Sequence, residues 1–270
     1  MKFAICNEVF EGWAIGDSIK FVADTGYDAI EIAPFTLAQY VTDVSVAERH
    51  RIRAVAADNG IGISAVHWVL IKTEGMYMTH TDPAVRRKTA DYFCELVKFC
   101  ADLGGEAIVV GSPKQRNLLP GVSFEQAWEL ARDTFVPSVK LAEDKGVTIC
   151  FEPLAPSETD FVNTAAKGIE LIQQFDSKAF KIILDVKAMC SDPKPIPDII
   201  HDSYPDFAYF HANDANLKGP GFGDVGFKPI FGALKEVGYD GFVSVEVFDF
   251  EEGAETIARE SLRYMREASA

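Results

Sequence analysis

The amino-acid sequence predicts an α/β fold, a single (β/α)8 barrel that extends over residues 1–270 as one domain. Eight short apolar runs rich in Val, Ile and Phe alternate with longer amphipathic segments from one end of the chain to the other. Several runs are nearly continuous in hydrophobicity, which is typical of parallel strands buried on both faces. The length of 270 residues suits one such barrel, which commonly needs about 250 residues, and no low-complexity linker divides the chain.

The eight apolar runs are the predicted strands. They cover, in chain order, Lys2–Cys6, Asp28–Ile32, Gly62–His67, Ala107–Gly111, Val147–Glu152, Lys181–Asp185, Phe207–His211 and Phe242–Glu246. An open doubly wound sheet is the alternative fold, and it usually carries a glycine-rich phosphate loop after its first strand. The first run is followed by Asn7-Glu8-Val9-Phe10 and by no G-x-G-x-x-G motif, so the sequence favours the closed TIM barrel.

Amphipathic segments between these runs are the predicted helices. They cover approximately Gly16–Thr25, Val44–Asn59, Pro83–Leu103, Ser123–Lys145, Thr164–Phe175, Ile196–Tyr204, Lys228–Val237 and Gly253–Glu267. Asp82 precedes Pro83, which suits a helix with an aspartate N-cap and a proline at its first position. Gly146 directly follows a helical run, where a left-handed residue commonly ends a helix.

Composition restricts the partners and the compartment of the protein. The formal net charge of −15 argues against nucleic acid, because nucleic-acid binders usually present a basic face. The five cysteines form no C-x-x-C pair, so we expect reduced, intracellular thiols. The N-terminal residues lack the features of a signal peptide, and no apolar run reaches the roughly 18 residues that span a bilayer. We therefore expect a cytoplasmic protein with no membrane partner.

Three carboxylates and one imidazole stand at the predicted carboxyl ends of the last four strands. They are Glu152, Asp185, His211 and Glu246. The active site of a (β/α)8 barrel lies at this end of the strands, so the four side chains should converge. Crowded carboxylates raise one another's pKa unless a cation neutralises them. The oxygen and nitrogen donors suit Mn²⁺, Mg²⁺, Co²⁺ or Fe²⁺, with Zn²⁺ as a further option, and predict a site for one divalent metal ion.

Several stretches of the chain resemble one known family. They are Phe151-Glu152-Pro153-Leu154, Glu158 to Thr164, Leu184-Asp185, His211, Gly221 to Phe227 and Val243 to Glu246. With these residues the chain resembles the xylose isomerase-like barrels, the sugar phosphate isomerases/epimerases that include D-tagatose 3-epimerase and the ketose 3-epimerases. The resemblance covers nearly the whole chain and implies a (β/α)8 fold and a sugar-like small-molecule substrate.

The resemblance also implies roles for individual residues. It makes Glu152, Asp185, His211 and Glu246 the ligands of one divalent ion, for which we expect Mn²⁺ in the first place. It makes Glu152 and Glu246 the catalytic pair, one removing a proton next to the substrate carbonyl and the other returning one, through a metal-stabilised enediolate. It places Glu158 in a hydrogen bond with the substrate near its carbonyl. Homodimers and homotetramers are common in the family, and we expect either by analogy.

The sequence departs from the ketose epimerases after the sixth predicted strand. Those enzymes carry Asp-x-x-His, whereas this chain has Asp185-Val186-Lys187-Ala188, with alanine at the position of the histidine. Lys187 would supply a cation that polarises a carbonyl, or it is an ordinary solvated lysine. The arginine expected beyond His211 is also missing, and Lys218 stands near that place. These departures argue against free D-tagatose or D-psicose as the natural substrate.

Other residues near the strand ends are further candidates for substrate contacts. His67, Trp68 and Trp13 would form an aromatic wall for a sugar face, with packing in the core as the alternative for each tryptophan. Glu8 and Glu31 would hydrogen-bond substrate hydroxyl groups. The segment from Gly111 to Arg116 contains two cations that would meet a phosphate or acid group, although a solvated loop is the favoured interpretation.

Isomerisation or epimerisation of a keto sugar or sugar derivative is the favoured function. A lyase or dehydratase acting on a keto sugar, an inosose or a 3-keto-glycoside is the main alternative, because it begins with the same proton abstraction. An apurinic nuclease of the endonuclease IV type is disfavoured. Such an enzyme uses additional histidines to hold three zinc ions, and this chain has Ala188 and Gly226 at two of those positions. A barrel without catalytic activity is also disfavoured, because it would not need four converging ligands.

Overall fold

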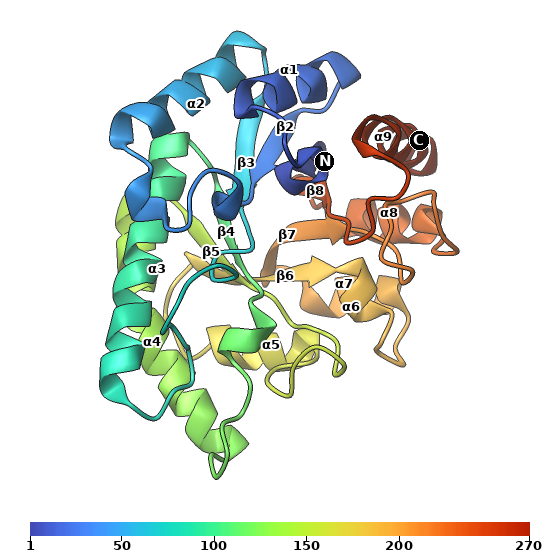
Figure 1. Cartoon of the computed structure of the whole chain (residues 1–270). Helices are drawn as coiled ribbons and strands as arrows, with labels where there is room; N and C mark the ends of the chain where they lie inside the picture. Colours follow the sequence, from blue (N-terminus) through green and yellow to red (C-terminus); the bar gives the residue numbers. More distant parts are fainter.

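The computed structural model describes residues 1–270. Its eight parallel strands pair in chain order, and β1 pairs with β8, which closes the sheet into a barrel (Figure 1). The strands are β1 (Lys2–Cys6), β2 (Ala29–Ile32), β3 (Gly62–Val66), β4 (Ala107–Val110), β5 (Thr148–Phe151), β6 (Phe180–Asp185), β7 (Phe207–Ala212) and β8 (Phe242–Val245). All eight predicted strands are present, with ends shifted by at most one residue, and the predicted (β/α)8 fold is confirmed.

Helices surround the strands in Figure 1. They are α1 (Ile15–Thr25), α2 (Val46–Asp58), α3 (Pro83–Leu103), α4 (Phe124–Lys145), α5 (Ala165–Ile172), α6 (Val186–Met189), α7 (Ile196–Ser203), α8 (Phe227–Glu236) and α9 (Ala254–Ser269). Four short 3₁₀ helices lie in the connections that follow β1, β2 and β4: η1 (Asn7–Phe10), η2 (Pro34–Thr36), η3 (Val41–Asp43) and η4 (Pro113–Gln115). The helix α6 is not among the predicted helices, since four residues are too few for a helical pattern.

Local sequence signals explain where the long helices begin and end. The Asp82 side chain caps α3 by accepting a hydrogen bond from the Ala84 N–H at 2.8 Å, directly before Pro83. Gly146 ends α4 in the left-handed conformation with φ of 66°, and its N–H donates to the carbonyl of Ala142. Glycine adopts this conformation without the steric cost that a Cβ brings, so α4 stops there and β5 follows at once.

The strand register brings the ends of the last three strands to one level. Asp185 of β6 pairs with His211 of β7, and His211 pairs with Ser244 of β8. Ala212 pairs with Val245, so Glu246 follows directly after the last paired residue of β8. Because the strands are parallel, their carboxyl ends meet at the same rim of the barrel.

Two apolar clusters fill the molecule. The larger one joins the outer faces of the strands to the helices, with members such as Ile30, Phe135 and Phe210. The smaller one takes members from all eight strands and from no helix, so it occupies the barrel interior. Alanines on the first four strands leave room there for the larger rings of Tyr209 and Phe242. They are Ala4, Ala29, Ala65 and Ala107.

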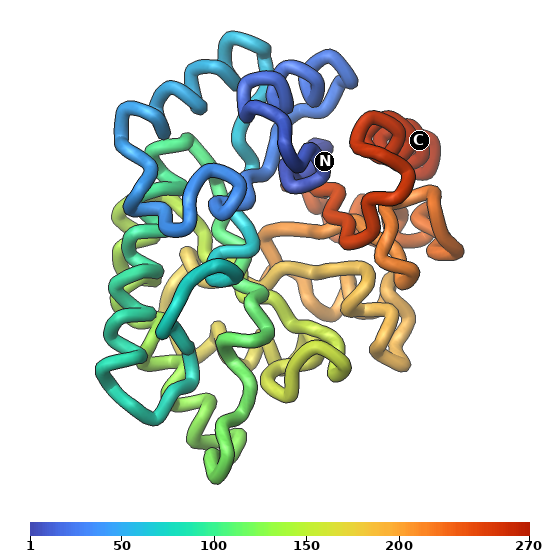
Figure 2. Tube along the Cα trace, viewed as in Figure 1, coloured from blue at the N-terminus to red at the C-terminus, as the bar shows by residue number.

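The two ends of the chain lie near each other. Figure 2 shows the first and last segments side by side, in agreement with the pairing of β1 and β8. No helix of the structure combines the length and the apolar composition that a membrane crossing requires.

Candidate active site

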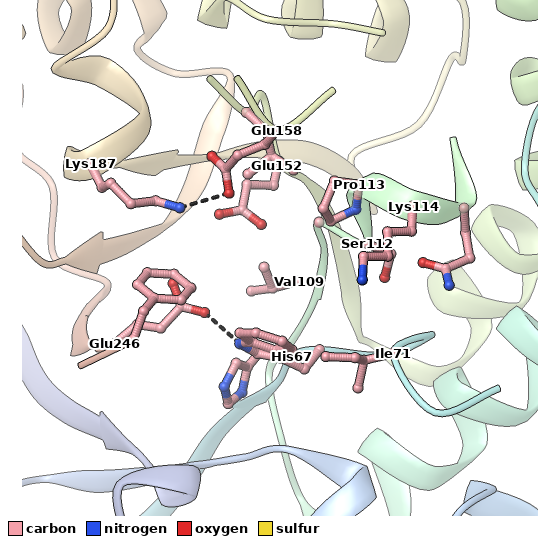
Figure 3. A pocket seen from close by; sticks show the side chains of 15 residues that line it. His67, Ile71, Val109, Ser112, Pro113, Lys114, Glu152, Glu158, Lys187 and Glu246 are labelled. Carbon is pink, nitrogen blue, oxygen red and sulfur yellow. Dashed lines mark hydrogen bonds and ion pairs between the residues drawn. The ribbon is translucent and has the colours of Figure 1, made fainter. Parts of the chain in front are cut away.

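A cavity of about 300 Å³ opens at the carboxyl ends of the strands (Figure 3). Its wall comes from the segments that follow β3, β4, β5, β6 and β8. The lining residues are His67, Trp68, Ile71, Val109, Gly111, Ser112, Pro113, Lys114, Gln115, Glu152, Leu154, Glu158, Lys187, Glu246 and Phe248. This volume lies in the range of pockets that bind small molecules.

Glu152, Asp185, His211 and Glu246 converge beside this cavity, and Glu152 and Glu246 are among its lining residues. One ligand atom from each of the four side chains lies within 4.8 Å of the others. All four side chains are buried, with exposed fractions of 7%, 2%, 0% and 4% respectively. They stand in or directly after four neighbouring strands, so the barrel brings them together at one rim.

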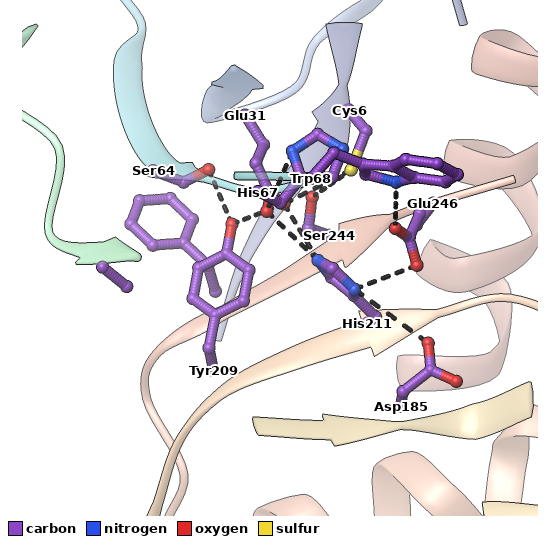
Figure 4. Close-up of polar contacts among 12 residues, drawn as sticks. Cys6, Glu31, Ser64, His67, Trp68, Asp185, Tyr209, His211, Ser244 and Glu246 are labelled. Carbon is purple, nitrogen blue, oxygen red and sulfur yellow. Dashed lines mark hydrogen bonds and ion pairs between the residues drawn. The ribbon is translucent and has the colours of Figure 1, made fainter. Parts of the chain in front are cut away.

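His211 points one ring nitrogen toward the carboxylates and the other away from them (Figure 4). Its Nδ1 lies 3.1 Å from Glu246 Oε2 and 4.0 Å from Asp185 Oδ2. This Nδ1 is buried and makes no hydrogen bond. Its Nε2 hydrogen-bonds to Glu31 Oε1 at 3.1 Å. A buried nitrogen without a hydrogen bond, facing several carboxylates, has the geometry of a metal ligand.

The electrostatics of the cluster also fit a divalent cation. Burial first, and then the negative charges of Glu246 and Asp185, raise the pKa of Glu152 to about 8. Burial and Glu246 likewise raise the pKa of Asp185 to about 6. Burial disfavours the charged form of His211, but Glu246 and Glu31 outweigh it and raise the pKa of His211 well above its usual range. The cluster therefore attracts positive charge, and its oxygen and nitrogen donors suit Mn²⁺, Mg²⁺, Co²⁺ or Zn²⁺.

Hydrogen bonds hold the Asp185 and Glu246 carboxylates in place. The Asn213 side-chain amide donates to Asp185 Oδ2 at 2.6 Å, and the Ala188 N–H donates to Asp185 Oδ1 at 2.7 Å. Asp185 therefore serves as the N-cap of α6 and fixes the first turn after β6. The Trp68 indole N–H donates to Glu246 Oε1 at 2.8 Å. Three donors, two amides and one indole, thus fix the orientation of the two acids.

Glu152 is positioned by the loop that follows β4. A Cβ added to Gly111 would lie 2.2 Å from Glu152 Oε2, so this carboxylate needs the space that glycine leaves. Arg116, fully buried in the same loop, donates from Nη1 to the backbone carbonyl of Glu152 at 2.7 Å. The β4 loop therefore sets both the backbone and the side chain of Glu152.

A lysine and a glutamate meet on one side of the cavity. Lys187 Nζ lies 2.7 Å from Glu158 Oε1 and 4.1 Å from the centre of the Phe248 ring. The other carboxylate oxygen of Glu158, Oε2, is buried and has no hydrogen-bond partner. The site therefore offers a cation and a free acceptor side by side, the groups that bind a carbonyl oxygen and a neighbouring hydroxyl.

A model of the family described as "Xylose isomerase-like TIM barrel" matches residues 19–268. The chain belongs to this family.

Named members of the family resemble the chain along most of its length. The D-psicose 3-epimerase of Ruminiclostridium cellulolyticum is 28% identical over 232 residues, which cover 85% of this chain and 77% of that one. The 3-dehydro-D-guloside 4-epimerase of Escherichia coli is 23% identical over 98% of this chain and 99% of its own. A crystal structure of D-psicose 3-epimerase in the presence of D-fructose superposes with a TM-score of 0.87 at 23% identity, covering 100% and 99% of the two chains. This last likeness shows the shared fold.

Only some of the other residues that the sequence predicts to contact the substrate lie in the wall of the cavity. His67, Trp68, Glu158 and Lys187 line it. Both nitrogens of His67 face carboxylates, with Nε2 at 2.9 Å from Glu8 Oε2 and Nδ1 at 3.4 Å from Glu31 Oε1. His67 therefore offers the cavity a ring edge, whereas Glu8 contacts His67 and is not among the lining residues.

Trp13 and Lys218 lie outside the lining residues. Trp13 packs against Phe10 and Phe21, with ring centres 5.5 Å apart in both pairs. Lys218 Nζ lies 2.5 Å from Glu252 Oε1 and 3.9 Å from Asp249 Oδ2, in the loop after β8. Neither side chain contacts the four-residue cluster in this arrangement.

Two expectations from the sequence are wrong. Glu31 does not contact the cavity, because its side chain has no exposed surface and lies behind His67 and His211. The segment after β4 is not simply a solvated loop, because Gly111 to Gln115 line the cavity and Arg116 is fully buried. Phe248 and Ile71 also line it and were not predicted, and only the position of Phe248 two residues after Glu246 gave a signal.

Proposed function

We propose that the chain is a divalent-metal-dependent epimerase of a keto sugar or a keto derivative of a sugar. The observation that supports this most strongly is the placement of two glutamates, Glu152 and Glu246, on two sides of one cavity (Figure 3). Asp185 and His211 lie close to both glutamates and complete a set of four side chains that would bind the metal. The named relatives are ketose 3-epimerases and a 4-epimerase of a 3-keto-glycoside, which agrees with this substrate class.

The two glutamates would move the proton. When bound, a divalent ion polarises a carbonyl oxygen and stabilises the negative charge that develops there. One glutamate removes the proton from the carbon next to the carbonyl, and the other returns a proton to the opposite face of the same carbon. Two bases on opposite faces invert the configuration of that carbon, which is epimerisation.

The remaining lining residues would orient the sugar. Glu158 Oε2, which lacks a partner, would accept a hydrogen bond from a hydroxyl group near the carbonyl. Lys187, 2.7 Å from the other oxygen of Glu158, would donate to a substrate oxygen on the same side. Trp68 and Phe248, whose ring centres are 6.0 Å apart, form an apolar surface for the carbon face of the sugar.

A lyase or dehydratase acting on a keto sugar, an inosose or a 3-keto-glycoside is the second candidate. It shares the abstraction of a proton by a glutamate. The position of Lys187 in the cavity wall favours this second candidate, because its ammonium group can protonate an oxygen that leaves the neighbouring carbon. The two candidates differ in their products and not in their first step.

Three finer assignments accompany the proposal. Mn²⁺ is the proposed ion, with Mg²⁺, Co²⁺ and Zn²⁺ as alternatives that the same donors accept. We propose a homodimer or a homotetramer by analogy with the family. A cytoplasmic location is proposed from the sequence alone.

Proton NMR in D₂O tests the reaction class. The Mg²⁺-loaded protein is incubated with a panel of ketohexoses, inososes and 3-keto-glycosides, since Mg²⁺ avoids paramagnetic broadening. The proposal predicts deuterium on the carbon beside the carbonyl and formation of the epimer with the carbon skeleton intact. An unsaturated or cleaved product assigns the protein to the lyases. Absence of exchange with every compound, when bound Mg²⁺ has been measured, would contradict both candidates.

A further inference from the structure

Glu31 is a buried carboxylate that no step of the proposed reaction uses. It lies on β2, contacts His67 of the cavity wall and has no exposed surface. Its Oε1 lies 3.1 Å from His211 Nε2 and 3.4 Å from His67 Nδ1. Its Oε2 lies 2.9 Å from the Tyr209 hydroxyl and 3.4 Å from Cys6 Sγ. Figure 4 shows these side chains gathered around Glu31 from several strands.

The contact with His211 decides which ring nitrogen carries a hydrogen. Glu31 Oε2 accepts hydrogen bonds from the Tyr209 hydroxyl and the Cys6 thiol, and Oε1 faces the His211 ring. Glu31 is therefore placed as an acceptor, and the His211 Nε2 that contacts it is the donor that carries the proton. A neutral imidazole has one N–H and one nitrogen lone pair, so the lone pair then lies on Nδ1. This is the nitrogen that faces Glu246 and Asp185, at 3.1 and 4.0 Å from their nearest oxygens.

Glu31 is itself held from several directions. His67 contacts Glu31 Oε1 through Nδ1, and its Nε2 contacts Glu8 Oε2 at 2.9 Å, which ties this imidazole to η1. From the barrel interior, Tyr209 reaches Glu31 and also lies 2.7 Å from Ser64 Oγ. The small alanine side chains on β1 to β4 leave the space that the Tyr209 ring needs. A carboxylate with this many partners has one position, and so has the imidazole that it contacts.

We infer that Glu31 is a positioning residue, which fixes the His211 ring and presents its Nδ1 lone pair to the divalent ion. The inference rests on the proposed function in requiring an ion at the four-residue cluster. Carboxylates in this relation to a metal-binding histidine usually change metal affinity by roughly 10- to 100-fold when they are lost. The role therefore appears in the binding of metal, separately from any turnover of substrate.

Metal affinity of a Glu31→Gln variant tests the inference. Mn²⁺ dissociation constants are measured by competition with a fluorescent chelator, at one pH, for the wild type, Glu31→Gln and Tyr209→Phe. The Tyr209→Phe control removes a contact to Glu31 and leaves the contact between Glu31 and His211. We expect Glu31→Gln to weaken Mn²⁺ binding by roughly 10- to 100-fold. Tyr209→Phe should weaken it clearly less, because Glu31 keeps its contacts with His211 and His67.

The possible results separate the two proposals. A wild type that binds Mn²⁺, with Glu31→Gln binding equally well, overturns the positioning role alone. Equal losses in Glu31→Gln and Tyr209→Phe also overturn it, because the effect would then belong to the core. A wild type that binds no divalent ion overturns the metal-dependent function and this inference together.

A second experiment uses only the wild type, so it does not require the Glu31→Gln variant to fold. Long-range ¹H–¹⁵N NMR spectra of histidine-labelled protein distinguish the ring nitrogen that carries a proton from the one bound to metal. On addition of diamagnetic Zn²⁺, we expect the imidazole that responds to bind through Nδ1 and to keep its proton on Nε2. Coordination through Nε2 would overturn the inference even if Glu31→Gln proved insoluble.

Discussion

Some side chains of the cavity carry a charge, and others fix the orientation of a charged neighbour. Trp68 belongs to the second group, because its indole N–H donates to Glu246 Oε1 while its ring lines the cavity. Its backbone has a φ of 55°, a left-handed conformation that is unusual for a large aromatic residue. Strained backbone of this kind concentrates at functional sites, which agrees with a role for the indole in placing Glu246.

Replacement of Trp68 by Phe separates its two contributions. Trp68→Phe keeps an aromatic wall and removes the hydrogen bond to Glu246. Hydrogen bonds to charged groups contribute about 1.5–3 kcal/mol, so we expect kcat to fall by roughly 10- to 100-fold with KM little changed. Steady-state kinetics on the substrate found by NMR measure both. A higher KM at unchanged kcat would show that Trp68 acts only as a wall.

Lys187 has a matched control in the same cavity. Lys187 is largely buried and contacts Glu158, whereas Lys114 lines the mouth and is exposed. We expect Lys187→Met to reduce kcat/KM by roughly 10- to 100-fold, because a donor to the reacting end of the substrate is lost. Lys114→Met should change it little. Equal effects of the two substitutions would indicate a general influence of positive charge and would contradict the assigned contact.

Among the elements, the loop after β4 has the closest contact with a catalytic side chain. Gly111 has no room for a Cβ, because such an atom would lie 2.2 Å from Glu152 Oε2. We therefore expect Gly111→Ala to displace Glu152 and to abolish most activity while the barrel stays folded. Kinetics and circular dichroism measure the two effects.

The control for this prediction is Gly232 in α8, where an added Cβ meets nothing within 4 Å. Alanine in a helix interior is favoured over glycine by about 0.5–1 kcal/mol, so Gly232→Ala should keep activity and unfold no more easily than the wild type. Full activity in Gly111→Ala would mean that Glu152 has more freedom than the structure indicates.

The same elements show what the sequence was able to predict. Alternating apolar runs and amphipathic segments give all eight strands, because each pattern is local and repeats along the chain. The convergence of Glu152, Asp185, His211 and Glu246 follows from their places at strand ends. Contacts across the barrel are different. Nothing near Glu31 in the sequence indicates Tyr209 or His211 as its partners, because these contacts depend on which side chains fill the interior.

Arg116 and the helix α6 illustrate two further limits. A loop arginine is normally solvated, and its burial against the Glu152 carbonyl depends on the path of the whole β4 loop. Four residues of α6 are too few to produce a helical period, and the helix forms because Asp185 caps it. Both features depend on tertiary contacts that a single sequence does not display.

For the molecule as a whole, the cluster links metal binding to stability and pH. Folding raises the pKa of Glu152 to about 8 and that of Asp185 to about 6, so the folded, metal-free protein binds more protons than the unfolded chain. Stability of the metal-free protein from this source therefore falls as pH rises from near 4 through 8. The raised pKa of His211 acts in the same direction, because its contribution is lost as pH rises.

Divalent metal should reverse this loss. The ion competes with the bound protons and stabilises only the folded state, so the increase in melting temperature on adding Mn²⁺ should be larger at pH 8 than at pH 6. Differential scanning fluorimetry after treatment with a chelator measures this at the two pH values. An increase that is larger at pH 6, or absent at both, would contradict the assignment of the ion to this cluster.

The division of labour between Glu152 and Glu246 is the central claim, and exchange in D₂O by single variants tests it most directly. Mg²⁺-loaded Glu152→Gln and Glu246→Gln, with bound Mg²⁺ measured in each, are incubated separately with the two epimers of the substrate. We predict that each variant exchanges the proton of only one epimer, a different one for each variant, and that neither interconverts the two epimers. Exchange of both epimers by one variant, or continued epimerisation, would contradict a mechanism with one glutamate on each face.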